Sequence, residues 1–224
     1  MLDWLLSLDK ELLLFFNGRH NPFWDTFMML TSGKVIWFVF YFVIVVAVIN
    51  TFGWRKGTLI ILSILLVIVL SDQIASGVFK PVFKRFRPSR DPSFSHLVHI
   101  VKGYTGGKYG FASSHASNSF GLAVFVSLLF KNRVTSVFVI FWAVLVSYSR
   151  IYLGVHYPGD IIVGALIGTL SACFVYSLLQ KYSKPSLICK PEQQTHPIAG
   201  IHQIALLGSL QIIVMLLSVF YILK

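Results

Sequence analysis

The sequence predicts an all-α membrane protein: a polytopic bundle of about six transmembrane helices, preceded by an N-terminal amphipathic helix at the membrane interface. Of its 224 residues, 56% are hydrophobic and only 12% are charged, whereas a soluble globular domain carries about 25% charged residues. Apolar runs recur along the chain, and a helix crosses a bilayer in about 20 mostly apolar residues. Because no repeat or low-complexity tract divides the chain, we expect a single domain over residues 1–224.

Residues 1–34 are expected to lie along the membrane surface. The stretch 2–16 mixes leucines with charged side chains, a pattern that favours an interfacial helix over a spanning one. Its charged residues are Asp3, Asp9, Lys10 and Glu11. The segment 17–34, which contains Asn21-Pro22 and Gly33, is predicted as a turn followed by an interfacial stretch.

Six apolar runs after this segment are the candidate spans. They cover residues 35–52, 58–79, 116–130, 134–148, 161–179 and 198–223. Threading the chain through them places residues 80–115 and 149–160 on one side of the membrane. The other side receives short basic segments at residues 54–56 and 131–133 and in the tail loop, which contains Lys181, Lys184 and Lys190.

The charge distribution suggests an orientation. The short basic loops contain few acids, which fits a cytoplasmic side under the positive-inside rule. We therefore expect an integral membrane protein with residues 80–115 and 149–160 outside the cytoplasm, which is the periplasmic, outer face if the membrane is a bacterial inner membrane. The formal net charge of +11 sits in loops between apolar runs, which favours anionic lipid over nucleic acid as a partner.

The composition suggests neither a metal nor a cofactor. The eight acidic residues are scattered, which argues against a carboxylate-built metal site. Cys173 lies in an apolar run and Cys189 in a polar one, and such a pair indicates neither a disulfide framework nor a zinc site. The N-terminus, MLDWLL, has neither the basic flank nor the small-residue cleavage site of a signal peptide.

The stretch SRIYLGVHYPGD at residues 149–160 is the most informative part of the chain. A carboxylate four residues after a histidine can fix one ring nitrogen, which leaves the other free as a nucleophile or base. The planar fork of Arg150 suits a phosphate. A purely structural pair of His156 and Asp160 is the alternative, and the nearby arginine, the spacing and the shared membrane side argue against it.

The stretch KPVFKRFRP at residues 80–88 gathers cations. Pro81 places Lys80 where a helix gives way to a loop. With Arg87, this lysine forms either a phosphate clamp or a basic cluster that reaches the lipid headgroups. Asp72 shares the helix face of Lys80 and either supports the site or simply pairs with the lysine.

The stretch FASSH at residues 111–115 opens the third apolar run. Small residues before a helix leave backbone N–H groups free, and the helix dipole favours an anion there. His115 would then stand beside that anion as a proton donor. The alternative is a capping serine next to an incidental interfacial histidine.

These three stretches resemble the signature of the type 2 phosphatidic acid phosphatase superfamily, whose pattern is KxxxxxxRP, then PSGH, then SRxxxxxHxxxD. The first and third pieces match completely, and the resemblance covers roughly residues 72–164, the expected catalytic region. In the middle piece Ala112 replaces the proline and Ser114 the glycine. The matching residues are Lys80, Arg87, Pro88, Ser113, His115, Ser149, Arg150, His156 and Asp160.

The resemblance implies a metal-independent, two-step phosphatase. His156 would attack phosphorus and form a phosphohistidine, with Asp160 holding its tautomer. His115 would protonate the leaving oxygen and then activate water. The remaining site residues would bind the phosphoryl oxygens: Lys80, Arg87, Ser113, Ser114 and Arg150.

The expected substrate is the phosphomonoester or diphosphate of a lipid, of the undecaprenyl diphosphate, lipid A or phosphatidylglycerol phosphate type. The motifs bind phosphate and leave the lipid open, and the loop of residues 89–110 is the expected place for headgroup selection. Two alternatives remain: a phosphotransferase that uses the same intermediate, and a non-catalytic lipid-binding or transport protein. The sequence leaves the oligomeric state unknown.

Overall fold

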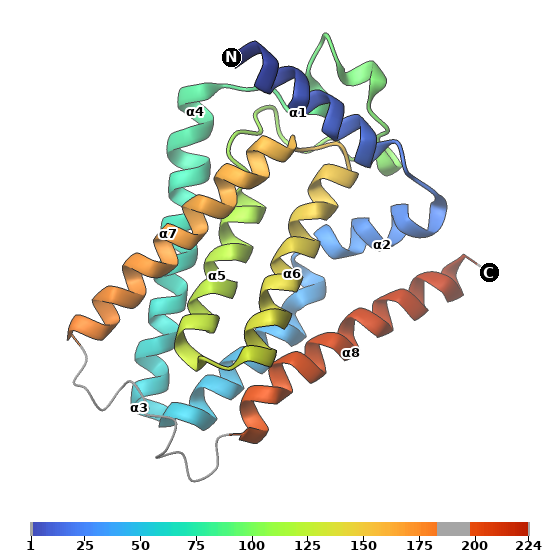
Figure 1. Ribbon diagram of the computed structural model, residues 1–224. Coiled ribbons are helices and arrows are strands. Elements are labelled where there is room, and N and C mark those ends of the chain that lie inside the picture. The colour runs from blue at the N-terminus through green and yellow to red at the C-terminus, as the bar shows by residue number, and fades with distance from the viewer. Residues whose placement is uncertain (1, 183–197, 224) are drawn as a thin grey trace.

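The computed structural model describes residues 2–182 and 198–223, and within these ranges the regular structure is helical (Figure 1). The predicted all-α fold is confirmed. The long helices are α1 (Leu2–Asn17), α2 (Pro22–Ser32), α3 (Phe38–Asp72), α5 (Ser114–Phe130), α6 (Arg133–Tyr152), α7 (Pro158–Tyr182) and α8 (Ile198–Ile222). A π-helical segment (Gln73–Phe79) and the short α4 (Lys80–Phe83) continue α3.

α5 lies at the centre of the bundle, where it packs against α6, α7 and α3. α8 crosses the outside of the bundle against α3 and α6, and α1 lies across the end where α5 and α7 begin (Figure 1). Small residues allow close packing inside: a Cβ added at Gly121 of α5 would lie 2.9 Å from the Ser71 hydroxyl. The close packing of α5 fixes the positions of the helix ends around it.

Local sequence determines where several helices begin. Asn21 caps α2 by accepting a hydrogen bond from Trp24 N at 2.9 Å, and Pro22 has the fixed φ that suits a first helical position. Asn132 caps α6 in the same way through Thr135 N, at 3.0 Å. The segment 17–34 therefore contains a helix, where the sequence predicted a turn and an interfacial stretch.

The first two predicted spans form one bent helical run. Gly53 adopts φ 73° and ψ 169° inside α3, a left-handed conformation that glycine adopts without steric cost. α3 folds back at the end of the bundle away from α1 (Figure 1), so the predicted spans 35–52 and 58–79 become the two arms of the helical run Val35–Phe83. The run also continues past Lys80 to Phe83, where a loop was predicted. The π-helical segment ends at Phe79, two residues before Pro81, and so covers the turn with which a proline clashes in a regular α-helix.

Four of the described helical runs are long and apolar enough to cross a membrane. They are Val35–Phe83, Arg133–Tyr152, Pro158–Tyr182 and His202–Ile222, while Ser114–Phe130 is shorter. The first run has 49 residues and contains two predicted spans, so the number six stays a prediction. Lys184, Cys189 and Lys190 of the predicted tail loop lie outside the described residues.

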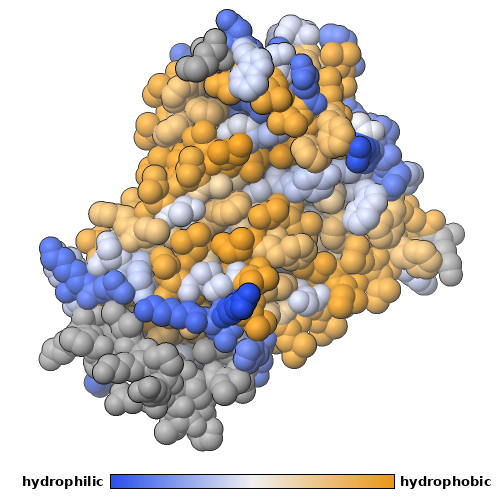
Figure 2. Space-filling model, in the orientation of Figure 1, coloured by the Kyte–Doolittle hydropathy of each residue, from blue (hydrophilic) through white to orange (hydrophobic). Residues whose placement is uncertain are grey.

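The surface fits a lipid environment. Figure 2 shows a broad hydrophobic face between more hydrophilic ends. Large apolar side chains point outward along the helices, among them Phe42, Leu62 and Leu170, each more than half exposed. A soluble protein rarely exposes contiguous apolar patches of this extent.

Candidate active site

The predicted site residues meet at the end of the bundle that α1 crosses (Figure 1). Lys80 lies at the top of the long helical run, Arg87 follows in the loop, and the serines and His115 open α5. Arg150 lies in the last turn of α6, His156 in the turn after it, and Asp160 in the first turn of α7. The structure therefore brings together the ends of separate helices, as the loop assignment predicted.

His156 and Asp160 form the buried centre of the site. Both side chains are 0% exposed, and His156 Nδ1 lies 3.2 Å from Asp160 Oδ2. On the other side of the ring, His156 Nε2 lies 3.0 Å from Arg87 Nη1. Because a guanidinium can only donate hydrogen bonds, Nε2 must be the acceptor and the ring proton must sit on Nδ1. The lone pair of His156 Nε2 therefore points toward Arg87 and accepts this hydrogen bond.

The electrostatic surroundings keep this histidine neutral. Burial, and then the charges of Arg87 and Arg150, hold the pKa of His156 well below its usual range. Burial, together with nearby Arg150, also lowers the pKa of Arg87 to about 10, so this guanidinium is still charged at neutral pH. A neutral imidazole beside fixed cations can attack a bound anion without first losing a proton.

The two arginines are held by partners outside the signature. Arg87 donates through Nε to Tyr109 O at 3.2 Å and through Nη1 to Val155 O at 3.1 Å. Arg150 is 1% exposed and donates to Ser32 Oγ and, at 3.0 Å, to Tyr104 Oη.

Among the described residues, Arg150 Nε has no hydrogen-bond partner. A buried cation with a free donor is costly unless an anion completes its bonding. This donor is therefore suited to a phosphoryl oxygen.

Lys80 and the two serines form the next part of the site. Lys80 Nζ donates to Ser76 Oγ at 3.1 Å and to Ser114 Oγ at 3.2 Å. The serine that replaces the glycine of the pattern thus holds the lysine in place. Among the described residues, no hydrogen bond or ion pair joins Lys80 and Asp72, and the Asp72 carboxylate accepts from Asn118 Nδ2 at 3.3 Å.

Ser113 connects α5 to α7. Its hydroxyl caps α5 by accepting from Ala116 N at 3.4 Å, and its own N–H donates to Asp160 O at 3.0 Å. That N–H is therefore engaged within the protein, while the hydroxyl hydrogen is left to donate. The anion-binding N–H groups of this helix end belong to the following residues of its first turn.

A cavity of about 430 Å³ adjoins the site between the arms of α3 and helices α5 and α6. Ser114, His115 and Lys34 line it toward the site. Farther along the helices its lining is apolar and aromatic: Phe38, Ile44, Ile61, Leu65 and Trp142. An apolar cavity that leads to a histidine and a lysine suits an amphipathic ligand with an anionic end.

Sequence reasoning missed several residues of this site. Ser32 and Tyr104 fix Arg150 from 118 and 46 positions away, and no local pattern marks them. Arg85, which the sequence placed only within a basic cluster, donates to Asp160 Oδ1 at 3.0 Å. Tyr104 lies in the loop 89–110, so one residue of the segment expected to select headgroups supports the phosphate site.

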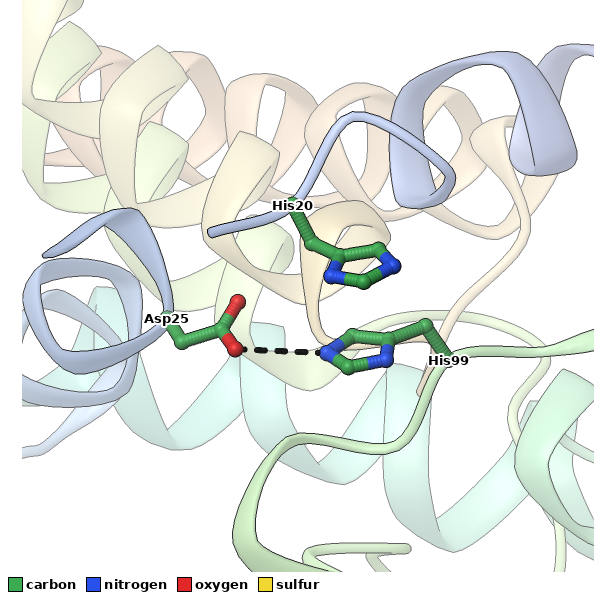
Figure 3. Close-up of side chains that lie close together, drawn as sticks. All are labelled: His20, Asp25 and His99. Carbon is green, nitrogen blue, oxygen red and sulfur yellow. Dashed lines mark hydrogen bonds and ion pairs between the residues drawn. The ribbon is translucent and has the colours of Figure 1, made fainter. Parts of the chain in front are cut away.

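A second polar cluster lies outside this site and joins three segments (Figure 3). Its ligand-type atoms, from His20, Asp25 and His99, lie within 4.8 Å of one another. His99 Nε2 is 3.3 Å from Asp25 Oδ2, and the two imidazole rings stack 3.5 Å apart with planes 3° from parallel. The nitrogen lone pairs of an imidazole lie in the plane of its ring. Because the two rings occupy parallel planes, their lone pairs do not converge on one ion. The ring stacking and the contact between His99 and Asp25 connect the loop of residues 89–110 to α2 and to the segment before it.

The comparison with protein families decides the classification. The PAP2 superfamily model matches residues 58–184, more than half of the chain. The chain belongs to the PAP2 superfamily. The resemblance read from the three motifs is confirmed.

Curated relatives in this superfamily match most of the chain. A lipid A 4'-phosphatase of Bacteroides thetaiotaomicron is 43% identical over 182 residues, which are 81% of this chain and 81% of the relative. A lipid A 4'-phosphatase of Porphyromonas gingivalis is 38% identical over 79% of this chain and 75% of its own length. The alignments extend well beyond the motif region.

Solved PAP2 structures share the fold. A transmembrane PAP2-type phosphatidylglycerolphosphate phosphatase of Bacillus subtilis superposes with a TM-score of 0.62 at 22% identity, covering 81% of this chain and 89% of that one. Aquifex aeolicus LpxE gives 0.55 at 27% identity, with coverages of 75% and 93%. The expected membrane lipid phosphatase is thus confirmed as the class of this PAP2 protein, and the chain is an integral membrane protein.

Proposed function

We propose that this PAP2 protein hydrolyses a phosphate monoester on a lipid A-type glycolipid, through a phosphohistidine formed on His156. The observation that carries this proposal is the tautomer of His156: its unprotonated Nε2 faces Arg87, while Nδ1–H is held by Asp160. The site would face the periplasm, as the basic loops at the opposite end favour.

In the first step the phosphate would bind among Lys80, Arg87 and Arg150 and would take the place of His156 Nε2 as the acceptor for Arg87. The Nε2 lone pair then forms the N–P bond while the P–O bond to the lipid breaks. His115 donates a proton to the leaving oxygen, and the bound phosphate anion favours the protonated form of this histidine. The three cations stabilise the charge on the phosphoryl oxygens.

In the second step a water molecule gives a proton to His115 as its oxygen attacks phosphorus. The N–P bond breaks, phosphate leaves, and both histidines return to their starting protonation states. Asp160 accepts the hydrogen bond from Nδ1–H throughout and stabilises the positive charge that His156 carries in the intermediate. Side chains of the protein supply the first nucleophile, the acid–base group and the positive charges of this cycle, and we expect no metal to take part.

The lipid specificity is supported by two further observations. The cavity beside His115 is lined mainly by apolar side chains, which suits an acyl chain next to the phosphate. The relatives that match about four fifths of the chain are named lipid A 4'-phosphatases. Relatives named undecaprenyl-diphosphatase match only 42% and 51% of it.

The test is phosphate release by purified protein in detergent, with EDTA present, from lipid A, undecaprenyl diphosphate and phosphatidylglycerol phosphate. We expect release from lipid A in preference to the others, with mass spectrometry identifying which phosphate is lost. Preference for another lipid would reject the substrate proposal. Phosphate found on an added acceptor lipid, instead of in solution, would identify a phosphotransferase.

A further inference from the structure

Helix α1 reaches the active site through a chain of charged side chains. Arg85 donates from Nη1 to Asp160 Oδ1 at 3.0 Å and from Nη2 to Asp9 Oδ2 at 2.7 Å. Asp9 also accepts from Gly159 N at 2.7 Å through its other oxygen. One acidic residue of α1 is therefore bound both to the arginine behind the catalytic pair and to the first turn of α7.

Burial makes these contacts stronger than ordinary surface ion pairs. The side chains of Asp9 and Arg85 are 11% and 22% exposed, and that of Asp160 is 0% exposed. The guanidinium also lies over the ring of Tyr157, with its carbon 4.1 Å from the ring centroid. Charge-assisted hydrogen bonds in such surroundings are short and geometrically specific, so the position of Arg85 is well defined.

The contacts have a direct consequence for His156. Asp160 uses Oδ2 for His156 Nδ1 and for Tyr157 N, and Oδ1 for Arg85. A buried carboxylate needs a positive partner to stay ionised, and an ionised Asp160 is what keeps the proton of His156 on Nδ1. Removing the arginine would weaken control of the tautomer, and removing Asp9 would free the arginine to move.

We propose that Asp9 and Arg85 are positioning residues of this enzyme, which hold Asp160 ionised and oriented so that His156 Nε2 is the nucleophile. The proposal rests on the proposed function of His156. It makes α1 part of the catalytic unit, although Asp9 lies outside residues 58–184 that match the family. Arg85 occupies an unspecified position of the first motif.

The test compares Asp9→Asn and Arg85→Gln with matched controls on the same elements. Asp3→Asn repeats the aspartate change at an exposed position of α1. Arg90→Gln repeats the arginine change at an exposed position in the segment that follows α4. For each full-length protein in detergent, we would measure kcat and KM for lipid A, the melting temperature, and the Kd for orthovanadate. Orthovanadate adopts the five-coordinate geometry of phosphoryl transfer and reports the site without turnover.

We expect kcat to fall about tenfold in Asp9→Asn and about 100-fold in Arg85→Gln, the range for losing a hydrogen bond to a charged group. Orthovanadate binding should weaken in parallel, KM should stay within about twofold, and Asp9→Glu should recover part of kcat. The controls should match the wild type.

A lowered melting temperature with unchanged kcat and orthovanadate binding would mean that these residues only attach α1, and would overturn the proposal. Wild-type protein that binds orthovanadate but releases phosphate from no lipid would reject the proposed function. Weaker orthovanadate binding in the two variants would still support the positioning role in that case.

Discussion

Gly110 offers a direct perturbation of the catalytic pair. A Cβ at this position would lie 2.9 Å from Asp160 Oδ2 and 3.2 Å from Arg87 Cγ, whereas ordinary contacts begin at 3.4 Å. Rotation of the Asp160 carboxylate would break two hydrogen bonds, because Oδ2 accepts from Tyr157 N at 3.1 Å and Oδ1 accepts from Arg85. In Gly110→Ala, the methyl group must therefore push the Asp160 carboxylate, which carries the hydrogen bond to His156 Nδ1.

The size of the effect follows from the distances. Relieving the contact requires a shift of about 0.5 Å, and a misplacement of about 1 Å in an active site costs roughly 100-fold in rate. We therefore expect kcat to fall about tenfold, which corresponds to about 1.4 kcal/mol of activation free energy. Overpacking should also lower the free energy of unfolding by about 1–3 kcal/mol.

Gly107→Ala is the matched control, because a Cβ there meets nothing within 4 Å and lies in the same loop. Both variants lose the same unfolded-state entropy, so their difference isolates the contacts of the added methyl group with Asp160 and Arg87. The assay is steady-state phosphate release, with thermal unfolding measured in the same detergent. If Gly110→Ala kept a kcat within twofold of Gly107→Ala, the described geometry of the pair would be wrong.

Three further predictions concern the guanidinium of Arg150, the protonation of His156 and the orientation in the membrane. Arg150→Lys should lower kcat/KM about 100-fold, since an ammonium cannot reproduce the bonds of the guanidinium. Tyr104→Phe should lower kcat/KM only about tenfold. Equal losses for the two variants in steady-state kinetics would argue that the guanidinium geometry of Arg150 is not required. The depressed pKa of His156 means that below pH 6.5 the unfolded chain binds a proton that the folded protein does not. The wild type should therefore lose stability relative to His156→Gln as the pH falls, by at most about 1.4 kcal/mol per pH unit, with no divergence above pH 6.5; parallel unfolding curves would place the pKa of His156 near its usual value. In spheroplasts of a cysteine-free variant, an impermeant maleimide should label His96→Cys and spare Trp54→Cys, and the opposite labelling would reverse the proposed orientation.

The sequence predicted the parts of the site that local patterns encode. His156 lies just before α7 and Asp160 in its first turn, four residues later, so their contact is a local event. The meeting of this pair with Lys80 and Arg87 was predictable because all of them fall at span ends on one side of the membrane. The apolar runs predicted the ends of α5 to α8 to within a few residues. A helix that crosses a bilayer needs an apolar stretch of matching length, so the length of the run indicates the length of the helix.

The missed features depend on contacts between distant segments. Asp9 and Arg85 are 76 positions apart, and a charge in an amphipathic stretch looks like any other solvated charge. α2 was missed because the turn signal at Asn21-Pro22 also serves as a helix start. The bend at Gly53 was predicted as a loop, since a glycine among polar residues indicates a break without showing that helix continues on both sides.

The central claim is that His156 is covalently phosphorylated. The measurement is a rapid-quench experiment with lipid A labelled with ³²P at the cleaved phosphate, stopped in alkaline detergent because phosphohistidine is labile in acid. We predict a burst of protein-bound label in the wild type, located on His156 by mass spectrometry, and none in His156→Gln. Wild-type turnover without any labelled protein, or label that persists in His156→Gln, would contradict the mechanism.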